Sequence, residues 1–312
     1  MKFRAVFFGT PAFAVPCLDA LVEVAEVVAV VCQPDKPKGR GLTLTPPPVK
    51  VRATELGIPV TQPTKLRTGE FAEWLRQQKV DVALVVAYGR ILPADVLAAP
   101  RLGCVNVHAS LLPKYRGAAP ITWAVVHGEK VTGVTLMQMD VGMDTGAMLE
   151  QFTMEVLPNE SAGEVGDRLS AVGARAVREG LPKYVDGGYT PEVQDETKAT
   201  PLAPMLKKED GRIAWEKTAQ QVHDHVRGMS PWPGATTTLG GKLIKVQSTR
   251  IVDFAKKDTP AGTVLLADKT RVIVAAGEGA VELVMIQLEG KKPMAAAQWH
   301  LGRGVNEGDR LT

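Results

Sequence analysis

The sequence has few cysteines, and they follow no metal-binding or disulfide pattern. Its 312 residues include three, Cys17, Cys32 and Cys104. An odd number of cysteines without a C-x-x-C spacing argues against a disulfide framework and against a cysteine zinc site. The sequence therefore favours a reducing compartment, and we expect a cytoplasmic protein without a bound metal.

Long hydrophobic runs and a strong net charge are also missing. Lys2 and Arg4 flank only a short apolar stretch, and Asp19 and Glu23 follow it, so we expect neither a signal peptide nor a transmembrane span. The net charge of +3 is too small to indicate nucleic-acid binding by itself. Residues 205–312 nevertheless carry 16 Lys and Arg against 12 Asp and Glu, which favours an anionic partner for that part of the chain.

The N-terminal part has the pattern of an α/β domain. Phe3 to Phe8 is a continuous apolar run, as expected for a strand buried on both faces of a parallel sheet. Pro11 can begin a helix, with Thr10 as its N-cap. Gly9 is the only glycine of this turn, whereas a dinucleotide-binding turn requires G-x-G-x-x-G. A generic α/β crossover is therefore the better interpretation.

Further helices and strands alternate through the first 190 residues, which predicts a Rossmann-like, mostly parallel sheet. A long amphipathic helix should cover this sheet. The predicted helices are Val49–Leu56, Glu70–Gln78, Ile121–His127 and Ala162–Val185, and the further strands are Val27–Cys32, Val82–Ala87, Thr135–Met139 and Met148–Met154.

The C-terminal part changes character. A helix over Ala219–Met229 precedes five short strand-like runs between turn residues, which predicts a small, OB-like β-barrel. A dimerisation or lid domain would show the same pattern. Residues 191–204 lack an apolar period and are rich in Pro, Thr and charge. We therefore predict a catalytic domain over 1–190, a linker over 191–204 and a C-terminal domain over 205–312.

One strand end carries a candidate catalytic pair. Asn106 lies in the predicted strand Cys104–Val107 and His108 follows directly after it. Because the two are two residues apart, both point to the face opposite Val105 and Val107. Two strand residues rise about 6.6 Å, so an amide and an imidazole can converge on one small group. Asp144 follows in a glycine-containing loop. Amide, imidazole and carboxylate suit acyl-group chemistry, although Asn106 and His108 could also be structural residues.

Two rival chemistries have less support. Cys104 points to the same face as His108, but their Cα atoms should lie about 13 Å apart, too far for a thiol–imidazole hydrogen bond. Cys104 is better interpreted as a buried apolar residue. His223 and His225 are two apart in a predicted helix and do not share a face, so they make a poor metal pair.

Three stretches resemble the folate-dependent formyltransferases. They are Asn106-Val107-His108-Ala109-Ser110-Leu111-Leu112-Pro113, Tyr115-Arg116-Gly117-Ala118-Ala119-Pro120 and Met139-Asp140 with Asp144-Thr145-Gly146. The resemblance extends over essentially the whole chain. It implies the formyltransferase fold and formyl transfer from 10-formyltetrahydrofolate, with Asn106, His108 and Asp144 as catalytic residues.

The resemblance also implies a folate site, with the pterin beyond the strand Val82–Ala87. The residues expected to bind it are Val86, Ala87, Tyr88, Gly89, Ile91, Leu92, Ser110, Leu111, Leu112, Pro113 and Asp140.

The acceptor is less firmly indicated than the donor. The match is closest to the family members that formylate initiator methionyl-tRNA, in which a basic loop at 33–48 meets the acceptor arm. Here the loop offers Lys36, Lys38 and Arg40, while Leu42 and Thr43 stand where many members have lysines. We expect a monomer that binds this tRNA and folate. The alternatives are a formyltransferase for glycinamide ribonucleotide or an amino sugar nucleotide, a folate-dependent hydrolase, and a nucleic-acid-binding protein with an inactive α/β domain.

Overall fold

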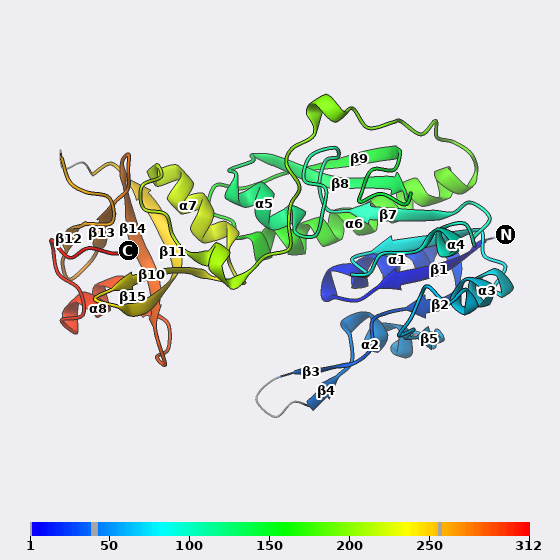
Figure 1. Cartoon of the computed structure of the whole chain (residues 1–312), viewed down its shortest axis with the longest axis horizontal. Helices are drawn as coiled ribbons and strands as arrows, with labels where there is room; N and C mark the ends of the chain where they lie inside the picture. Colours follow the sequence, from blue (N-terminus) through cyan, green and yellow to red (C-terminus); the bar gives the residue numbers. More distant parts are fainter. Residues whose placement is uncertain (1, 39–42, 255–257) are drawn as a thin grey trace. The chain divides into compact units, whose positions relative to one another are not determined.

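The chain divides into two compact units, whose elements are shown in Figure 1. A computed structural model describes residues 2–38, 43–254 and 258–312. The first unit comprises residues 1–120, 131–155 and 166–203, and the second comprises residues 121–130, 156–165 and 204–312. The predicted division at 1–190, 191–204 and 205–312 stays a prediction about which parts fold independently.

A seven-stranded sheet forms the centre of the first unit. Its strand order is β5-β2-β1-β6-β7-β8-β9. The first five of these strands are parallel, while β8 and β9 run antiparallel to their neighbours. This arrangement confirms the predicted, mostly parallel sheet. The strands are Phe3–Gly9 (β1), Ala25–Val31 (β2), Val60–Thr61 (β5), Val82–Val86 (β6), Cys104–His108 (β7), Val131–Gln138 (β8) and Met148–Glu155 (β9).

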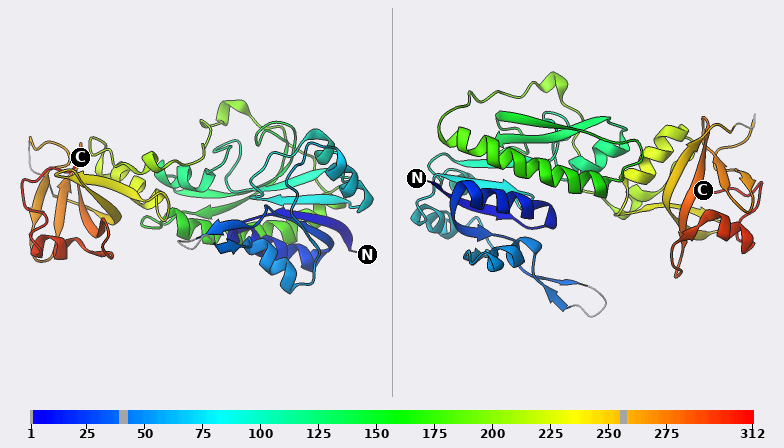
Figure 2. Two further views of the ribbon diagram at one scale, coloured as in Figure 1. Left: turned by 60° about the horizontal axis from the view of Figure 1, so that its bottom comes forward. Right: turned by 180° about the vertical axis from the view of Figure 1, so that it is seen from behind.

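Helices cover both faces of this sheet. On one face, α1 (Val15–Val24) and α6 (Ala162–Val185) run next to each other, as the rear view in Figure 2 shows. A Cβ on Gly173 of α6 would meet Cys17 and Val107, so a glycine is what lets helix and sheet approach closely here. On the other face, the ring of Phe8 packs edge-on against Phe71. The remaining helices of this unit are Pro48–Glu55 (α2), Glu70–Gln77 (α3) and Ala94–Leu97 (α4).

The predicted N-cap at Thr10 is wrong. A short 3-10 turn, Ala12–Ala14, follows Pro11, and α1 begins only at Val15. The Thr10 hydroxyl instead donates to the Tyr88 carbonyl at 3.0 Å, across the sheet edge. A tertiary hydrogen bond has therefore replaced the local cap.

The stretch 33–48, which the sequence predicts as a basic loop, contains a hairpin. Strand β3 (Lys36–Lys38) pairs antiparallel with β4 (Thr43–Thr45). The sequence did carry a signal, because Thr43-Leu44-Thr45 places β-branched residues in strand alternation.

The second unit contains an antiparallel sheet in the order β10-β11-β14-β13-β12, with β15 on β14. Residues 309–312 form backbone hydrogen bonds with both outer strands of this sheet, β10 and β12. The Thr238 N–H donates to the Thr312 carbonyl at 2.7 Å, and the Val264 N–H donates to the Asp309 carbonyl at 2.8 Å. This bridging segment closes the sheet into a small barrel and confirms the predicted antiparallel β domain. The strands are Ala235–Leu239 (β10), Lys242–Val252 (β11), Val264–Ala267 (β12), Val272–Ala275 (β13), Ala280–Leu288 (β14) and Met294–Ala295 (β15).

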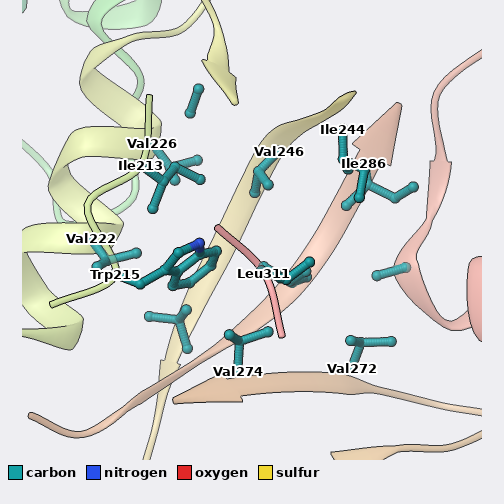
Figure 3. Packing of buried hydrophobic residues seen from close by; sticks show 14 of the residues in the cluster. Ile213, Trp215, Val222, Val226, Ile244, Val246, Val272, Val274, Ile286 and Leu311 are labelled. Atoms are coloured by element: carbon teal, nitrogen blue, oxygen red, sulfur yellow. The ribbon is translucent and has the colours of Figure 1, made fainter. Parts of the chain in front are cut away.

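Three helices accompany the barrel: Pro120–Val126 (α5), Ala219–Gly228 (α7) and Ala296–Leu301 (α8). Figure 3 shows Val222 and Val226 of α7 facing Trp215 and the apolar residues of the strands. The indole N–H of Trp215 donates to the Thr237 hydroxyl at 3.0 Å, so this large buried side chain leaves no polar atom unsatisfied.

No helix in the described ranges combines the length and the hydrophobicity that a membrane crossing requires.

Candidate active site

The candidate catalytic pair lies at the carboxyl end of β7, near the middle of the first sheet. Asn106 is 8% exposed and His108 is 5% exposed. Asn106 pairs with Val85 of β6 on one side and with Met137 of β8 on the other. Directly opposed residues share a face of the sheet, so the side chains of Asn106 and Met137 lie together.

The hydrogen bonds of His108 indicate where its protons sit. Its Nε2 lies 3.0 Å from the Tyr115 carbonyl oxygen, which can only accept, so Nε2–H is the donor. Its Nδ1 lies 3.7 Å from Oδ1 of Asp144. In the neutral ring, Nδ1 would carry a lone pair toward this carboxylate. A proton on Nδ1 converts the contact into an ion pair.

Asn106 has a side chain that is available to a ligand. Within the described part of the chain, its amide makes no hydrogen bond to another protein group. A nearly buried amide with free N–H donors suits the stabilisation of a developing oxyanion.

Asp144 is held in a left-handed backbone conformation, with φ of 55°. Its Oδ2 accepts a hydrogen bond of 2.8 Å from the Gly117 N–H. Gly117 itself has φ of 120°, and a Cβ there would meet the Ala203 carbonyl oxygen. Only glycine fits this position, because both its backbone angle and its surroundings exclude a side chain.

Asp140 shapes the loop that carries Asp144. Its Oδ1 accepts hydrogen bonds of 2.9 Å from the Gly142 N–H and the Thr145 hydroxyl. These bonds close the turn from inside, as carboxylates near a turn commonly do.

A pocket of about 320 Å³ lies beside this loop, within the size range of small-molecule sites. Three large apolar side chains at the pocket are strongly exposed to solvent. Their exposed fractions are 69% for Ile91, 77% for Val141 and 55% for Met143. Exposed apolar groups around a hollow favour a ligand with an apolar ring system. The lining residues are Arg90, Ile91, Leu92, Met137, Met139, Asp140, Val141, Gly142, Met143 and Asp144.

Three of the eleven predicted folate residues line this pocket. Ile91, Leu92 and Asp140 line the pocket beside Asp144. The other eight do not line it: Val86, Ala87, Tyr88, Gly89, Ser110, Leu111, Leu112 and Pro113. Among the pocket residues that the sequence interpretation missed, Met137 and Met139 alternate in the sequence and could have been found from the strand period.

The Tyr88–Gly89 exit of β6 is occupied by protein contacts. Gln33 Nε2 donates to the carbonyls of Tyr88 at 2.9 Å and Gly89 at 3.1 Å. The Tyr88 ring packs against Phe8, and burial raises the pKa of its hydroxyl to about 12. Ser110 likewise donates its hydroxyl to the Lys114 carbonyl at 2.6 Å.

Two of the three predicted RNA-contacting residues lie on the hairpin. Lys36 is exposed on β3, and Lys38 ends the same strand. Arg40 lies outside the described residues.

The two rival chemistries find no geometric support. The Cys104 thiol lies 3.8 Å from the Leu97 carbonyl, and burial raises its pKa to about 12, so it is an inert core group. Among the described residues, no group of three or more His, Cys, Asp or Glu side chains could hold a metal ion.

The chain matches two family models. One, described as formyl transferase, covers residues 1–181, and the other, formyl transferase C-terminal domain, covers residues 205–304. The chain is 56% identical over 306 residues to the methionyl-tRNA formyltransferase of Sorangium cellulosum, covering 98% of both chains. It is 49% identical over 308 residues to the methionyl-tRNA formyltransferase of Myxococcus xanthus, covering 98% of this chain and 97% of that one.

A solved structure shares the fold. It is the N-formyltransferase from Helicobacter canadensis, in complex with folinic acid and dTDP-3-aminofucose. The TM-score is 0.68 at 17% identity, over 91% of this chain and 99% of that one. At this identity the similarity supports the architecture alone.

Proposed function

Because the chain belongs to the formyl transferase family, we propose that it transfers the formyl group of 10-formyltetrahydrofolate to the α-amine of initiator methionyl-tRNA. Relatives named for this reaction are 56% and 49% identical to it over nearly the full length. The proposal includes a cytoplasmic monomer that uses folate as co-substrate and needs no metal.

The observation that carries the proposal is the contact between His108 and Asp144 at the end of β7. Nδ1 of His108 lies 3.7 Å from Oδ1 of Asp144, which lines the pocket, and Asn106 lies two residues before His108 on the same strand. The amine attacks the formyl carbon, an oxyanion develops on the formyl oxygen, and N10 of the folate leaves. Asn106 donates its N–H to that oxyanion. Loss of one such donor typically costs about 2.7–4 kcal/mol.

His108 and Asp144 carry out the proton transfer from the attacking nitrogen to the leaving nitrogen. The attacking nitrogen must lose a proton and the leaving nitrogen must gain one. Nδ1 of His108 is the ring nitrogen available for this exchange, because Nε2 is already donating to Tyr115. Asp144 stabilises the imidazolium that forms when Nδ1 takes up a proton. No covalent nucleophile is needed, since a deprotonated α-amine attacks readily and titrates at about 7.7–8.0 in its free form.

The pocket beside Asp144 is proposed to hold the pterin of the donor. Its apolar rim of Ile91, Val141 and Met143 would be covered by the ring system. The other predicted folate residues, at 86–89 and 110–113, remain part of the proposed folate site. Lys36 and Lys38 of β3, together with Arg40, are proposed to meet the acceptor arm of the tRNA.

One assay tests the reaction and its acceptor. Purified protein is incubated with donor labelled in the formyl group and with charged initiator tRNA. We expect labelled formyl-methionyl-tRNA as the product. A labelled glycinamide ribonucleotide or amino sugar nucleotide, each offered separately, would instead identify a small-amine acceptor. Free labelled formate would indicate a hydrolase.

A further inference from the structure

The segment 191–203 packs against the candidate active site instead of running free. At its start, Glu192 and Met148 exchange two backbone hydrogen bonds of 2.8 Å. At its end, the Ala203 carbonyl accepts from the Ala118 N–H at 2.9 Å. Both ends of the segment are therefore fixed to the first unit.

Gln194, within this segment, is bonded to the loop that carries Asp144. Its side-chain Nε2 donates to the carbonyls of Asp144 and Gly146, each at 2.8 Å. Its Oε1 accepts from Nε of Arg116 at 2.9 Å. Gln194 is 5% exposed, although its neighbour Val193 is 82% exposed. Gln194 is therefore a buried polar residue within an exposed stretch. Both N–H donors of its side chain are hydrogen-bonded to the loop that carries Asp144.

Arg116 anchors Gln194 from the other side. Its two terminal nitrogens donate to the two oxygens of Glu196 at 3.0 and 2.7 Å, a bidentate arrangement that fixes the guanidinium. The residue after Arg116 is Gly117, whose N–H holds the Asp144 carboxylate. Gln194 thus binds the backbone carbonyl of Asp144, and the Gly117 N–H binds its carboxylate. The two contacts are linked because Gln194 also bonds to Arg116, the neighbour of Gly117.

We propose that Gln194 is a positioning residue for Asp144, acting through the two carbonyls that flank the Asp144 turn. This inference rests on the proposed formyl transfer. The backbone of Asp144 has φ of 55°, a conformation that persists only when the surroundings impose it. Gln194 supplies that constraint from a segment that lies 50 residues after Asp144 in the sequence. Small misplacements of a catalytic group cost up to about 100-fold in rate.

The test compares wild type, Asp144→Ala, Gln194→Met and the double variant, with the steady-state kinetics of methionyl-tRNA formylation as the readout. Methionine keeps the approximate volume of glutamine and lacks its donors. We expect Gln194→Met to lower kcat about 10-fold or more with an unchanged KM for 10-formyltetrahydrofolate. In the Asp144→Ala background, the same substitution should have no further effect. Val193→Ala is the matched control on the same segment and should behave as wild type.

Two results would overturn the inference. One is an unchanged kcat in Gln194→Met. The other is an equal loss in both backgrounds, which would mean that Gln194 supports the fold and not Asp144. Should Gln194→Met fail to fold, Gln194→Glu takes its place, since it lacks the donors but still accepts from Arg116. Inactive wild type, or full turnover in Asp144→Ala, would contradict the proposed function instead.

Discussion

At the scale of single residues, the partners of His108 determine how it can move a proton. Tyr115 occupies Nε2, so the imidazole can exchange a proton only at Nδ1, next to Asp144. The sequence interpretation could place His108 and Asn106 on one face, because strand alternation is a local rule. It could not specify the tautomer, since that depends on a backbone carbonyl seven residues away in a turn.

Substitutions at the three proposed catalytic positions should separate effects on the reaction rate from effects on folding. We expect Asn106→Ala, His108→Ala and Asp144→Ala each to lower kcat at least about 100-fold, because each removes a group that acts in the transition state. Circular dichroism should stay unchanged. Cys104→Ala is the control on the same strand and should keep its turnover, because the thiol is buried and inert. Near-normal turnover in His108→Ala would rule out the proposed proton transfer.

Gln194 shows what local sequence patterns cannot reveal. Its neighbours are polar or exposed, and nothing in the composition of 191–204 distinguishes it from a linker residue. Its partners Asp144 and Gly146 lie 50 and 48 residues earlier in the chain. A contact between residues so far apart in the sequence produces no hydrophobic period, no helix cap and no turn motif, so sequence patterns cannot reveal it.

At the scale of secondary structure elements, long apolar or periodic segments were predictable and short paired ones were not. Helix α6 was predicted with its observed bounds, Ala162–Val185, since an amphipathic period over 24 residues is a strong signal. Strands β3 and β4 have three residues each, so the alternation of Thr43, Leu44 and Thr45 is too short to outweigh the prolines and charges around it.

The hairpin offers a charge test of the RNA contact. We expect Arg40→Ala to lower kcat/KM for methionyl-tRNA about 10-fold, on the order of 1.4 kcal/mol. Each lost contact to a single-stranded phosphate should reduce the log–log salt slope of binding by roughly 0.7, so Lys36→Ala and Lys38→Ala should act in the same direction. The measurement is a salt titration of tRNA binding.

Lys79→Asn controls for the loss of one positive charge elsewhere. Lys79 is exposed and has φ of 50°, which asparagine tolerates. Folate affinity should stay the same in all four variants. Equal salt slopes for wild type and the hairpin variants would contradict an RNA contact, and weakened folate binding would assign the hairpin to the other substrate.

At the scale of the whole molecule, the buried His223 and the partly buried His225 couple the free energy of unfolding to pH. Burial lowers the pKa of His223, which lies between the Thr249 hydroxyl at 2.9 Å and the Pro158 carbonyl at 3.2 Å, and burial also lowers the pKa of His225. Below the ordinary value near 6.5, the unfolded chain therefore takes up protons that the folded chain excludes. The free energy of unfolding should fall as the pH drops through this range, by at most about 1.4 kcal/mol per pH unit for each excluded proton.

Urea unfolding between about pH 7.5 and 5.5 measures this effect. His223→Gln and His225→Gln should each flatten the profile, because neither side chain then titrates. A profile as steep as that of wild type in both variants would assign the pH dependence to other groups.

Removal of the C-terminal part tests the assignment of the tRNA-binding surface. A fragment ending at Pro204 keeps the sheet, the pocket and Gln194, so we expect it to bind folate. It loses the positive excess of residues 205–312 and should lose most of its tRNA affinity in filter binding. Trp123 and Val126 of α5 pack against the second core, so the fragment should also melt at a lower temperature than the full chain. Unchanged tRNA affinity would mean that the C-terminal part has another purpose.

All three natural cysteines are buried in the first unit, and burial raises the pKa of Cys17 to about 12, of Cys32 to about 11 and of Cys104 to about 12. Thiol reagents react with the thiolate, so the folded protein should remain unlabelled by maleimides at neutral pH. A single cysteine introduced at the exposed Lys36 would then accept a fluorophore without removal of any natural cysteine. Changes in its emission would report in real time when the hairpin meets RNA, and labelling of the native thiols would report unfolding.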